Sequence, residues 1–579
     1  MKALVELAKR RGFFFQTGAA YGGVGGFYTY GPHGATLKAA VEASWRDRWA
    51  VREGHDEIDA PTILPEAVFE ASGHLDGFDD LLVTCPDCER SHRADHLIEG
   101  QTKIEEAESY APEEVQSLLG DHEITCPSCG AALAGEPVEE FNLMFETAIG
   151  PGSTDRGYLR PETAQGIFVD FPRLKEYARE ELPFGVAQIG RAYRNEISPR
   201  NALVRTREFS QAELEFFFDP SVHDPPIETV ADVSAPLYSA AAQQGDGQPA
   251  LQSIGEALET GPFEDPWLAY YVGVATEWYR SLGLDMNRVR FRQHLPAERA
   301  HYAENCWDAE ADVSAPGEDP DWIELAGIAN RGAYDLSHHE AATDEQYSVF
   351  SAYEEPRTVE RATVDPDMAT LGPAYGEKAA EIADRLVKLA ETDRSAFEGE
   401  TVTVELEDET VSIPVERTGF AVETVEERGE QFTPHVIEPS MGLDRTIYAM
   451  LVHAYDEDTV DGEERTVLRL EPAMAPTLVG VFPLMDKDGL GERARELVET
   501  LREAGLSVAY DDSGAIGRRY RRQDEIGTPF CVTVDYETLE DGTVTVRDRD
   551  STDQVRVDVD ELARTLAALR DGEVAVEQL

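Results

Sequence analysis

The sequence predicts an α+β protein whose main part is an antiparallel sheet with inserts, followed by a smaller α/β domain. Two runs of alternating apolar and polar residues, within 184–193 and 208–218, flank a loop that contains several arginines. This alternation is typical of two antiparallel strands joined by a long connection. From about residue 475 onward, short apolar strands alternate with amphipathic helices, which is the pattern of an α/β domain. At 579 residues, the chain is long enough for about three or four domains.

The predicted strand pair at 184–218 carries charged side chains that can share one cavity. Residues i and i+2 of a strand lie on one face, so Arg194 with Glu196, and Glu213 with Glu215, are expected to point the same way. Arginine binds phosphate oxygens in a bidentate manner, and carboxylates accept hydrogen bonds from an ammonium group. The pattern favours a substrate that carries both phosphate and a cationic amine; an exposed hairpin with surface ion pairs is the structural alternative.

The formal net charge of −63 is unusual for a protein that binds a polyanion, because phosphate contacts normally use a basic surface. The acidic residues are spread along the whole chain, and only eight of the basic residues are lysine. Salt screens the self-repulsion of such a surface, so we interpret the charge as halophilic adaptation to a very salty cytoplasm. The absence of a signal-peptide core and of any run of 18 apolar residues predicts a cytoplasmic protein that is not bound to a membrane.

A glycine-rich run at 21–34 precedes a helical pattern from Ala35 to Trp49. Such a run could cradle phosphate at a helix N-terminus. No strand precedes it in a βαβ unit and no Gly-Lys-Ser/Thr follows, so a flexible turn that enters a helix is favoured. Residues 54–61 then have the pattern of a strand that ends at Pro61.

Four of the six cysteines form two Cys-x-x-Cys pairs, which argues for metal binding and against a disulfide framework. Two such pairs supply the four thiolates of a closed tetrahedral zinc site, which stabilises a fold and performs no chemistry. We predict a structural zinc site, with two incidental pairs as the alternative. Its ligands are Cys85, Cys88, Cys126 and Cys129.

Two polar stretches interrupt the predicted core. Residues 220–320 surround a helical stretch, Trp267 to Leu282, and residues 350–430 hold a charged helix, Ala379 to Glu391, beside strand-like alternation. Between them, an apolar strand within 321–339 bears Glu324, a carboxylate suited to magnesium beside a phosphate-filled cleft. Residues 435–455 then predict a strand, a tight turn at Gly442 and a helix whose first turn presents Arg445.

In the last domain, residues 477–484 and 506–512 predict strands and 491–505 a helix. Its most conspicuous feature is the most basic cluster of this acidic chain. This cluster is a candidate nucleic-acid contact, with a solvated helix face as the alternative. Its members are Arg518, Arg519, Arg521 and Arg522.

Three segments resemble, in order, the three motifs of the class II aminoacyl-tRNA synthetases. Residues 54–61 match motif 1, which builds the dimer interface, and 442–445 match motif 3. Motif 2 is matched by the triplets Arg194-Asn195-Glu196 and Arg207-Glu208-Phe209. Residues 71–78, 93–96, 141–145 and 158–168 are similar to glycyl-tRNA synthetases of the archaeal type, and the last domain resembles their anticodon-binding domain. The resemblance covers nearly the whole chain.

The resemblance implies that the protein activates glycine with ATP to glycyl-adenylate and transfers it to the 3′ end of tRNA(Gly). It implies a homodimer, Mg²⁺ bound with ATP and structural Zn²⁺. The implied catalytic residues are Arg194 at the α-phosphate, Arg445 at the γ-phosphate and Glu324 as magnesium ligand. The implied ATP-binding residues are Arg194, Asn195, Glu196, Arg205, Arg207, Glu208, Phe209, Glu324, Leu325, Gly442, Leu443, Asp444 and Arg445. The implied glycine-binding residues are Arg93, Glu162, Phe209, Gln211, Glu213, Glu438, Ser440 and Gly442.

The resemblance also divides the chain into segments. The catalytic core is expected in four parts, 1–84, 141–219, 321–349 and 431–473. The zinc-binding insertion is expected at 85–140, two further insertions at 220–320 and 350–430, and the anticodon-binding domain at 474–579.

Two rival functions belong to other classes. One is a catalytically inactive, synthetase-like subunit that binds nucleic acid, which should have lost the ATP-binding residues. The other is a ligase that loads glycine onto a protein carrier, which could dispense with an anticodon-binding domain. A resemblance in fold alone does not separate them. The presence of Arg194, Glu196, Glu324 and Arg445, together with the last domain, favours the synthetase.

Overall fold

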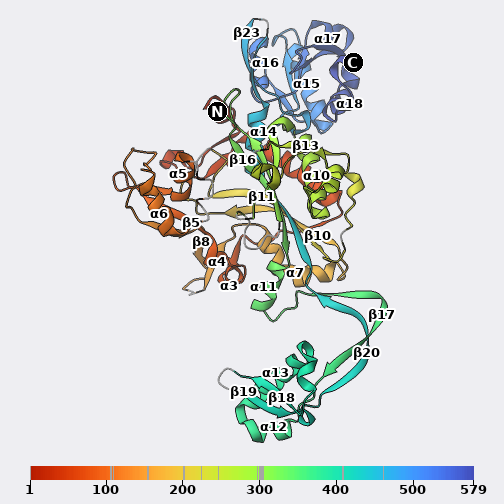
Figure 1. Ribbon diagram of the computed structural model, residues 1–579. Helices are drawn as coiled ribbons and strands as arrows, with labels where there is room; N and C mark the ends of the chain where they lie inside the picture. Colours follow the sequence, from red (N-terminus) through yellow and green to blue (C-terminus); the bar gives the residue numbers. More distant parts are fainter. Residues whose placement is uncertain are drawn as a thin grey trace. The chain divides into compact units, whose positions relative to one another are not determined.

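The computed structural model describes residues 2–102, 104, 107, 110–152, 155–199, 202–222, 224–245, 247–296, 298, 305–406, 410–460 and 462–579. The chain forms two compact units (Figure 1). The larger consists of Met1–Tyr347 together with Pro434–Leu579, and the smaller is Ser348–Thr433.

The larger unit is built on a nine-stranded sheet with the order β13-β12-β14-β15-β16-β21-β11-β10-β3 (Figure 1). Its five central strands, from β15 to β10, are antiparallel. The predicted strand pair forms β10 and β11, in unbroken register from Phe184 opposite Phe217 to Tyr193 opposite Glu208. The central strands are β15 (Asn305–Asp312), β16 (Trp322–Gly332), β21 (His435–Gly442), β11 (Glu208–Phe218) and β10 (Phe184–Tyr193).

The outer strands are β13 (Ala250–Ser253), β12 (Ser234–Tyr238), β14 (Val289–Gln293) and β3 (Asp56–Glu57). The strand expected at 54–61 therefore pairs over only two residues, parallel to β10. The Ile58 N–H still donates to Ala187, but Pro61 has no N–H with which to extend the ladder.

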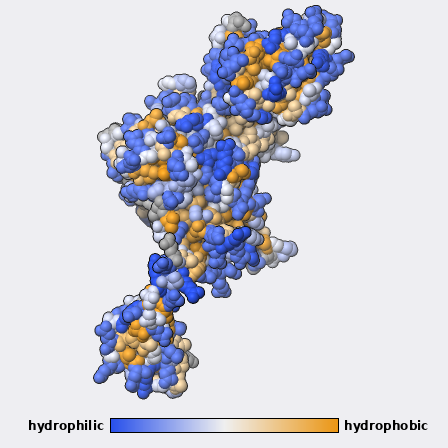
Figure 2. Space-filling view, turned by 90° about the vertical axis from the view of Figure 1, so that its right-hand side faces the viewer, coloured by the Kyte–Doolittle hydropathy of each residue, from blue (hydrophilic) through white to orange (hydrophobic). Residues whose placement is uncertain are grey.

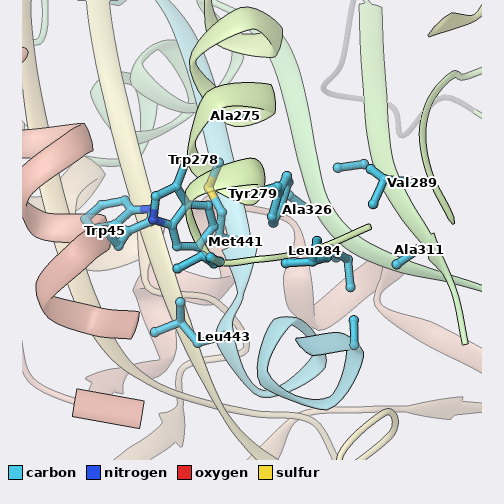
Figure 3. Packing of buried hydrophobic residues seen from close by; sticks show 14 of the residues in the cluster. Trp45, Ala275, Trp278, Tyr279, Leu284, Val289, Ala311, Ala326, Met441 and Leu443 are labelled. Atoms are coloured by element: carbon cyan, nitrogen blue, oxygen red, sulfur yellow. The ribbon is translucent and has the colours of Figure 1, made fainter. Parts of the chain in front are cut away.

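Alternation along the strands divides the central sheet into an apolar and a polar face. Ala212, Ile328 and Met441 belong to the apolar face and to one core that also includes buried residues of three helices. These helices are α2 (Pro32–Trp45), α10 (Pro266–Ser281) and α14 (Leu443–Ala454). Figure 3 shows Trp45 and Trp278 of this core beside Met441. The polar groups of interest lie on the opposite face, which this packing leaves open.

The segment with the two cysteine pairs has its own small core. It contains a three-stranded sheet of β6 (Ser91–Arg93), β5 (Asp79–Thr84) and β7 (Val138–Asn142). Helices α5 (Ala94–Gln101) and α6 (Pro112–Asp121) pack with it through Val83, Ile98 and Leu119.

The last part of the chain is an α/β domain, as predicted. Its five-stranded sheet has the order β25-β24-β26-β27-β28, with parallel pairing of β24 to both neighbours. These strands are β25 (Val508–Tyr510), β24 (Val479–Pro483), β26 (Phe530–Val534), β27 (Thr543–Asp548) and β28 (Gln554–Asp558). The helices are α15 (Leu490–Glu503), α16 (Ile516–Asp524), α17 (Tyr536–Asp541) and α18 (Val559–Arg570).

The smaller unit is carried by two long antiparallel strands, β17 (Val349–Thr363) and β20 (Ala421–Phe432). Between them lie α12 (Met368–Tyr375), α13 (Ala379–Thr392), β18 (Thr401–Glu405) and β19 (Thr410–Pro414). Val349 pairs with Phe432, so the chain enters and leaves this unit at neighbouring positions.

Hydrophilic side chains cover much of the face shown in Figure 2, with smaller hydrophobic patches between them. Within the described part of the chain, no helix combines the length and the apolar character needed to span a bilayer.

Candidate active site

A cleft on the polar face of the sheet contains most of the residues expected to bind ATP. It is lined by β11, the β10–β11 loop, β16, the end of β21 and the start of α14. The predicted residues among its lining are Arg194, Glu196, Arg205, Phe209, Gln211, Glu324, Leu325, Ser440, Gly442, Asp444 and Arg445. Asn195, Arg207, Glu208 and Leu443 are not among its lining residues.

Arg194 has capacity left for an anion. Its guanidinium lies over the rings of Phe78 and Phe209, with 5.3 and 5.4 Å to their centroids. Its Nε donates to the Pro161 carbonyl at 3.3 Å, and none of the ion pairs found among the described residues involves it. The aromatic contacts and the carbonyl hold the fork in place, so its remaining N–H groups can face a phosphate.

The other arginines of the β10–β11 loop are engaged with the protein. Arg205 pairs with Glu196 at 2.5 Å and with Asp80 at 3.3 Å. Arg207 donates to the Glu196 carbonyl at 2.8 Å and to the Gly25 carbonyl at 3.0 Å. These contacts fix the loop against the glycine-rich segment and the cysteine-containing segment.

Arg445 and Glu324 form an ion pair inside the cleft, with 3.0 Å between Nη1 and Oε2. Arg445 also donates to the carbonyls of Val204 and Glu324. Partial desolvation raises the pKa of Glu324, but the positive charges of Arg445 and Arg194 outweigh it and lower this pKa. The carboxylate is therefore ionised at neutral pH and, with its side chain 52% exposed, is open to a cation.

Three of the residues expected to bind ATP have their side chains committed to the fold. Asp444 accepts hydrogen bonds from the Tyr30 hydroxyl at 2.5 Å and from the Ser210 N–H at 2.9 Å. Leu325 and Leu443 are buried in the core, so only their backbone groups can meet a ligand. Asp444 thus anchors the first turn of α14 and thereby positions Arg445.

Next to this cleft, four glutamates are buried on the same face of the sheet. Glu162 precedes helix α7 (Ala164–Tyr177), Glu213 and Glu215 lie on β11, and Glu438 lies on β21. Each is less than 9% exposed. Glu162 lies beside Gln165, whose Nε2 donates to it at 2.8 Å, and His74, whose Nε2 is 3.7 Å away.

Glu213 is tied to both neighbouring elements. It accepts from the Ser440 hydroxyl at 2.5 Å, from the Ala164 N–H at 2.7 Å and from the Thr163 hydroxyl. Burial and the neighbouring charge of Glu162 nevertheless raise the pKa of Glu213. The two oxygens of Glu215 are buried and have no hydrogen-bond partner among the described residues, and burial raises the pKa of this group well above its usual range.

Arg331 is the buried cation of this group, and sequence reasoning assigned it no role. It donates to Asp335 at 2.6 and 2.7 Å and to Glu438 at 3.0 Å. Even so, burial raises the pKa of Glu438 to about 8. One guanidinium does not neutralise the surrounding carboxylates, so the pocket favours a small cation. Arg331 lies at the end of β16 and Asp335 in the first turn of helix α11 (Tyr334–Ala342), so neither a strand nor a helix periodicity of the sequence indicated this pair.

Arg93, expected near glycine, is not among the lining residues of the cleft. It pairs with Asp80 at 3.0 Å and with Asp95, and Asp80 also pairs with Arg205. These contacts link the cysteine-containing segment to the β10–β11 loop.

The four cysteines of the two pairs lie together. All four sulfur atoms are within 4.8 Å of one another, with 3.5 Å between Cys85 and Cys129 and 3.7 Å between Cys88 and Cys126. Four thiolates at about 2.3 Å from a tetrahedral zinc would be about 3.8 Å apart. The Ser128 N–H points at the Cys126 sulfur at 3.4 Å. The donor set and spacing therefore fit a closed Zn²⁺ site.

The arginine cluster of the last domain is mostly used within that domain. Arg519 is buried and donates to the carbonyls of Pro483, Asp512 and Gly514. Arg522 pairs with Asp511 at 2.5 Å, and Arg521 lies 3.5 Å from Asp524. Of this run only Arg518 is exposed, so the cluster forms neither a free basic patch nor a wholly solvated face.

Both the sequence and the fold are similar to those of known proteins. The tRNA synthetase class II core domain (G, H, P, S and T) matches residues 149–248, and the anticodon binding domain matches residues 478–569. A prolyl-tRNA synthetase from Cryptosporidium parvum, solved with L-proline and AMP, superposes with a TM-score of 0.51 at 11% identity, over 98% of this chain and 75% of its own. This likeness confirms the predicted fold of a class II core followed by an anticodon-binding domain.

Relatives that match over almost their full length identify the family more specifically. The glycine–tRNA ligase of Methanothrix thermoacetophila is 49% identical over 98% of this chain and 97% of its own length. The glycine–tRNA ligase of Archaeoglobus fulgidus is 45% identical over 99% of this chain and 97% of its own length. Identity at this level along almost the whole length shows that the chain belongs to the glycine–tRNA ligase family of class II aminoacyl-tRNA synthetases.

Proposed function

We propose that the protein activates glycine with ATP and transfers it to the 3′ end of tRNA(Gly). The observation that carries this proposal is the group of buried glutamates beside the Arg194 and Arg445 cleft. Of the three buried carboxyl groups Glu162, Glu213 and Glu438, only Glu438 forms an ion pair with an arginine among the described residues, namely with Arg331. Such a pocket attracts the ammonium group of a small amino acid, while the neighbouring cleft offers cations to phosphate.

In the first step, an oxygen of the glycine carboxylate attacks the α-phosphorus, and pyrophosphate leaves. Negative charge then builds on the phosphate oxygens. Arg194 stabilises the α-phosphate and Arg445 the γ-phosphate, and fixed cations aimed at developing charge lower the barrier without a covalent enzyme intermediate. Glu196 and Phe209 hold and stack the adenine.

Glu324 would hold the magnesium ion, which supplies further positive charge to the phosphates when bound. Its ionised, half-exposed carboxylate in the cleft supports this role. Gly442 and the backbone of Leu325 shape the adjoining wall.

Glycine has no side chain that a pocket could bind, so selectivity must come from steric exclusion of larger amino acids. Favourable contact with one methyl group changes the binding free energy by only about 1 to 3 kcal/mol. Rejection of alanine therefore needs a steric clash with its methyl group. Ser440 supports this role, because its hydroxyl is fixed on Glu213 beside the expected α-carbon position.

The four cysteines would hold a structural Zn²⁺ that stabilises the segment next to the ATP loop. A homodimer, as the resemblance implies, is supported by the short edge strand β3, and the chain segments before and after it carry the exposed apolar residues Val51 and Ile63. Such exposed edges are suited to pairing between subunits. A halophilic, cytoplasmic protein is supported by the net charge of −63.

The decisive experiment is amino-acid-dependent exchange of pyrophosphate into ATP in molar potassium chloride, across all twenty amino acids. We expect exchange with glycine alone, followed by charging of tRNA(Gly). If no amino acid supports exchange in folded protein that retains its zinc, the activity is disproved and a nucleic-acid-binding subunit becomes the better description. Exchange with glycine but charging of a carrier protein in place of tRNA would identify the protein as the carrier ligase.

A further inference from the structure

The polar face of the sheet continues beyond the glycine and ATP residues onto β14 and β15. Asp308 on β15 is opposite Gly327 on β16, Gly327 is opposite Ser440 on β21, and Ser440 is opposite Glu213 on β11. Opposed residues of an antiparallel sheet lie on the same face. Asp308 therefore belongs to the same row as the glycine-binding residues, two strands from Ser440, which is roughly 10 Å.

The middle position of this row, Gly327, carries no side chain, and we call the surface over it the bare strip. A Cβ built on Gly327 would have one heavy atom of the described residues within 4 Å, Asp308 Oδ1 at 3.7 Å. The floor between Ser440 and Asp308 is thus open, and Asp308 Oδ1 borders it.

Asp308 is held by two neighbours. The His294 Nε2–H at the end of β14 donates to Asp308 Oδ2 at 2.6 Å, which fixes the carboxylate and leaves Oδ1 toward the bare strip. The buried Cys306 thiol lies 3.7 Å from Oδ1. The Asp308 side chain is 14% exposed, so part of it is accessible while most of it is shielded.

If the proposed function holds, the geometry of the bound intermediate indicates which reacting group lies next to Asp308. The ammonium group lies among Glu162, Glu213 and Glu438, and the α-phosphate lies at Arg194. The carbonyl carbon of glycyl-adenylate joins these two ends and lies over the strip beside Ser440. In the row Glu213–Ser440–Gly327–Asp308, Asp308 lies at the end away from Glu213, and we place the incoming acceptor on this side.

We propose that Asp308 is a catalytic residue for transfer, which binds the attacking ribose hydroxyl of the tRNA terminus and accepts its proton, with His294 as its positioning residue. The hydroxyl oxygen forms the ester bond with the glycyl carbonyl carbon. The bond between that carbon and the phosphate oxygen breaks, and AMP leaves with the electron pair. The hydroxyl proton moves to Asp308 Oδ1.

The acid–base properties of the pair agree with this role. Burial raises the pKa of Asp308 to about 6, against the opposing hydrogen bond from His294, and Glu324 and Glu310 also raise it. Burial lowers the pKa of His294, but Asp308 outweighs it and the net direction is upward; Glu298 raises it further and Arg292 lowers it. A base that titrates near pH 6 is ionised at neutral pH and still basic enough to take a proton.

The test separates activation from transfer. Asp308→Asn should slow single-turnover transfer from preformed enzyme-bound glycyl-adenylate to tRNA(Gly) by about a hundredfold, while glycine-dependent pyrophosphate exchange changes less than about threefold. Asp312→Asn is the matched control, because Asp312 lies on the same strand but caps the Ser314 and Asp321 N–H groups. It should alter neither rate.

The positioning role of His294 has its own readout. Wild-type transfer should rise with pH through about 6, and His294→Ala should shift this rise to higher pH because it removes the hydrogen bond that lowers the Asp308 pKa. His294→Gln, which keeps an N–H donor, should restore part of the shift. The proposal is overturned if Asp308→Asn leaves transfer unchanged, or if it abolishes exchange as well, which would assign Asp308 to the nucleotide. Failure of the wild-type protein to support exchange would instead disprove the proposed function.

Discussion

At the scale of single residues, the pocket proposed for glycine concentrates buried carboxyl groups. Glu162, Glu213, Glu215 and Glu438 are all buried, and Arg331 is shared with Asp335. Buried carboxylates of this kind raise one another's pKa and bind a cation strongly when one is offered. The substrate ammonium is that cation in our proposal.

Glu162→Ala should raise the KM for glycine strongly, by about tenfold to a hundredfold, since hydrogen bonds to charged groups contribute about 1.5 to 3 kcal/mol. The KM for glycine is measured by glycine-dependent pyrophosphate exchange. Glu176→Ala is the control, because that exposed residue of α7 pairs only with Arg173 among the described residues. Normal glycine kinetics in Glu162→Ala would refute the assigned role.

Glycine binding should release protons near neutral pH. Glu438 has a pKa of about 8, so it is mostly protonated at pH 7, and an ammonium beside it favours the ionised form. Binding at pH 7 should therefore release up to about 0.9 proton, and glycine affinity should rise as the pH increases toward 8. Calorimetry in buffers of different ionisation enthalpy measures this release. Glu438→Gln should remove it, and an unchanged release in that variant would contradict the assignment.

At the scale of elements, two segments are separable from the catalytic sheet by their own packing. The cysteine-containing segment has its own core, and the smaller unit has its own helices and sheet. The four cysteines of the first segment and the residues of the second do not line the cleft, so both can be changed without altering a cleft residue.

Cys126→Ser should lower the zinc content from one ion per chain to nearly none, because a structural site needs all four thiolates. Protein purified without added zinc and analysed for metal provides the measurement. Limited proteolysis should then cleave within 85–140. Cys306→Ser, which lies outside the cluster, should keep its metal; retention of zinc by Cys126→Ser would eliminate this assignment.

Replacement of residues 350–431 by two glycines should leave glycine-dependent exchange within about twofold of the wild type. The expectation rests on the pairing of Val349 with Phe432, which already brings the two ends together, and short flexible loops close at small entropic cost. Loss of exchange would mean that the smaller unit supports the site. The melting temperature of the shortened chain distinguishes that outcome from misfolding.

Sequence patterns predicted most elements because local periodicity sets them. The pair of strands around Arg194, the strand with Glu324 and the helix that begins beside Arg445 all occur, and the predicted class II fold is confirmed. The role of Arg331, the anchoring of Asp444 by Tyr30 and the burial of Arg519 were not predicted. Each depends on contacts between residues far apart in the chain, on which a local pattern carries no information.

At the scale of the whole molecule, the dominant property is the net charge of −63. Self-repulsion of this size destabilises a compact state unless salt screens it. Hydrophilic side chains dominate the visible surface, so most of this charge is accessible to counterions (Figure 2).

The melting temperature should therefore rise with potassium chloride from dilute buffer to molar concentrations, because the Debye length shortens from about 30 Å at 0.01 M to about 3 Å at 1 M. Calorimetry or circular dichroism at a series of salt concentrations measures the trend. Full stability in dilute buffer would contradict the proposed halophilic adaptation.

The ion pair between Arg445 and Glu324 has a thermodynamic consequence. Without ligands, the group proposed for the γ-phosphate and the group proposed for magnesium neutralise each other at 3.0 Å. A nucleotide that arrives without its cation takes Arg445 from Glu324 and leaves a carboxylate beside phosphate, whereas a cation alone leaves Arg445 without an anion. If both assignments hold, the two ligands together satisfy both groups, so we expect positively cooperative binding in which, by linkage, each ligand strengthens the affinity of the other by the same factor.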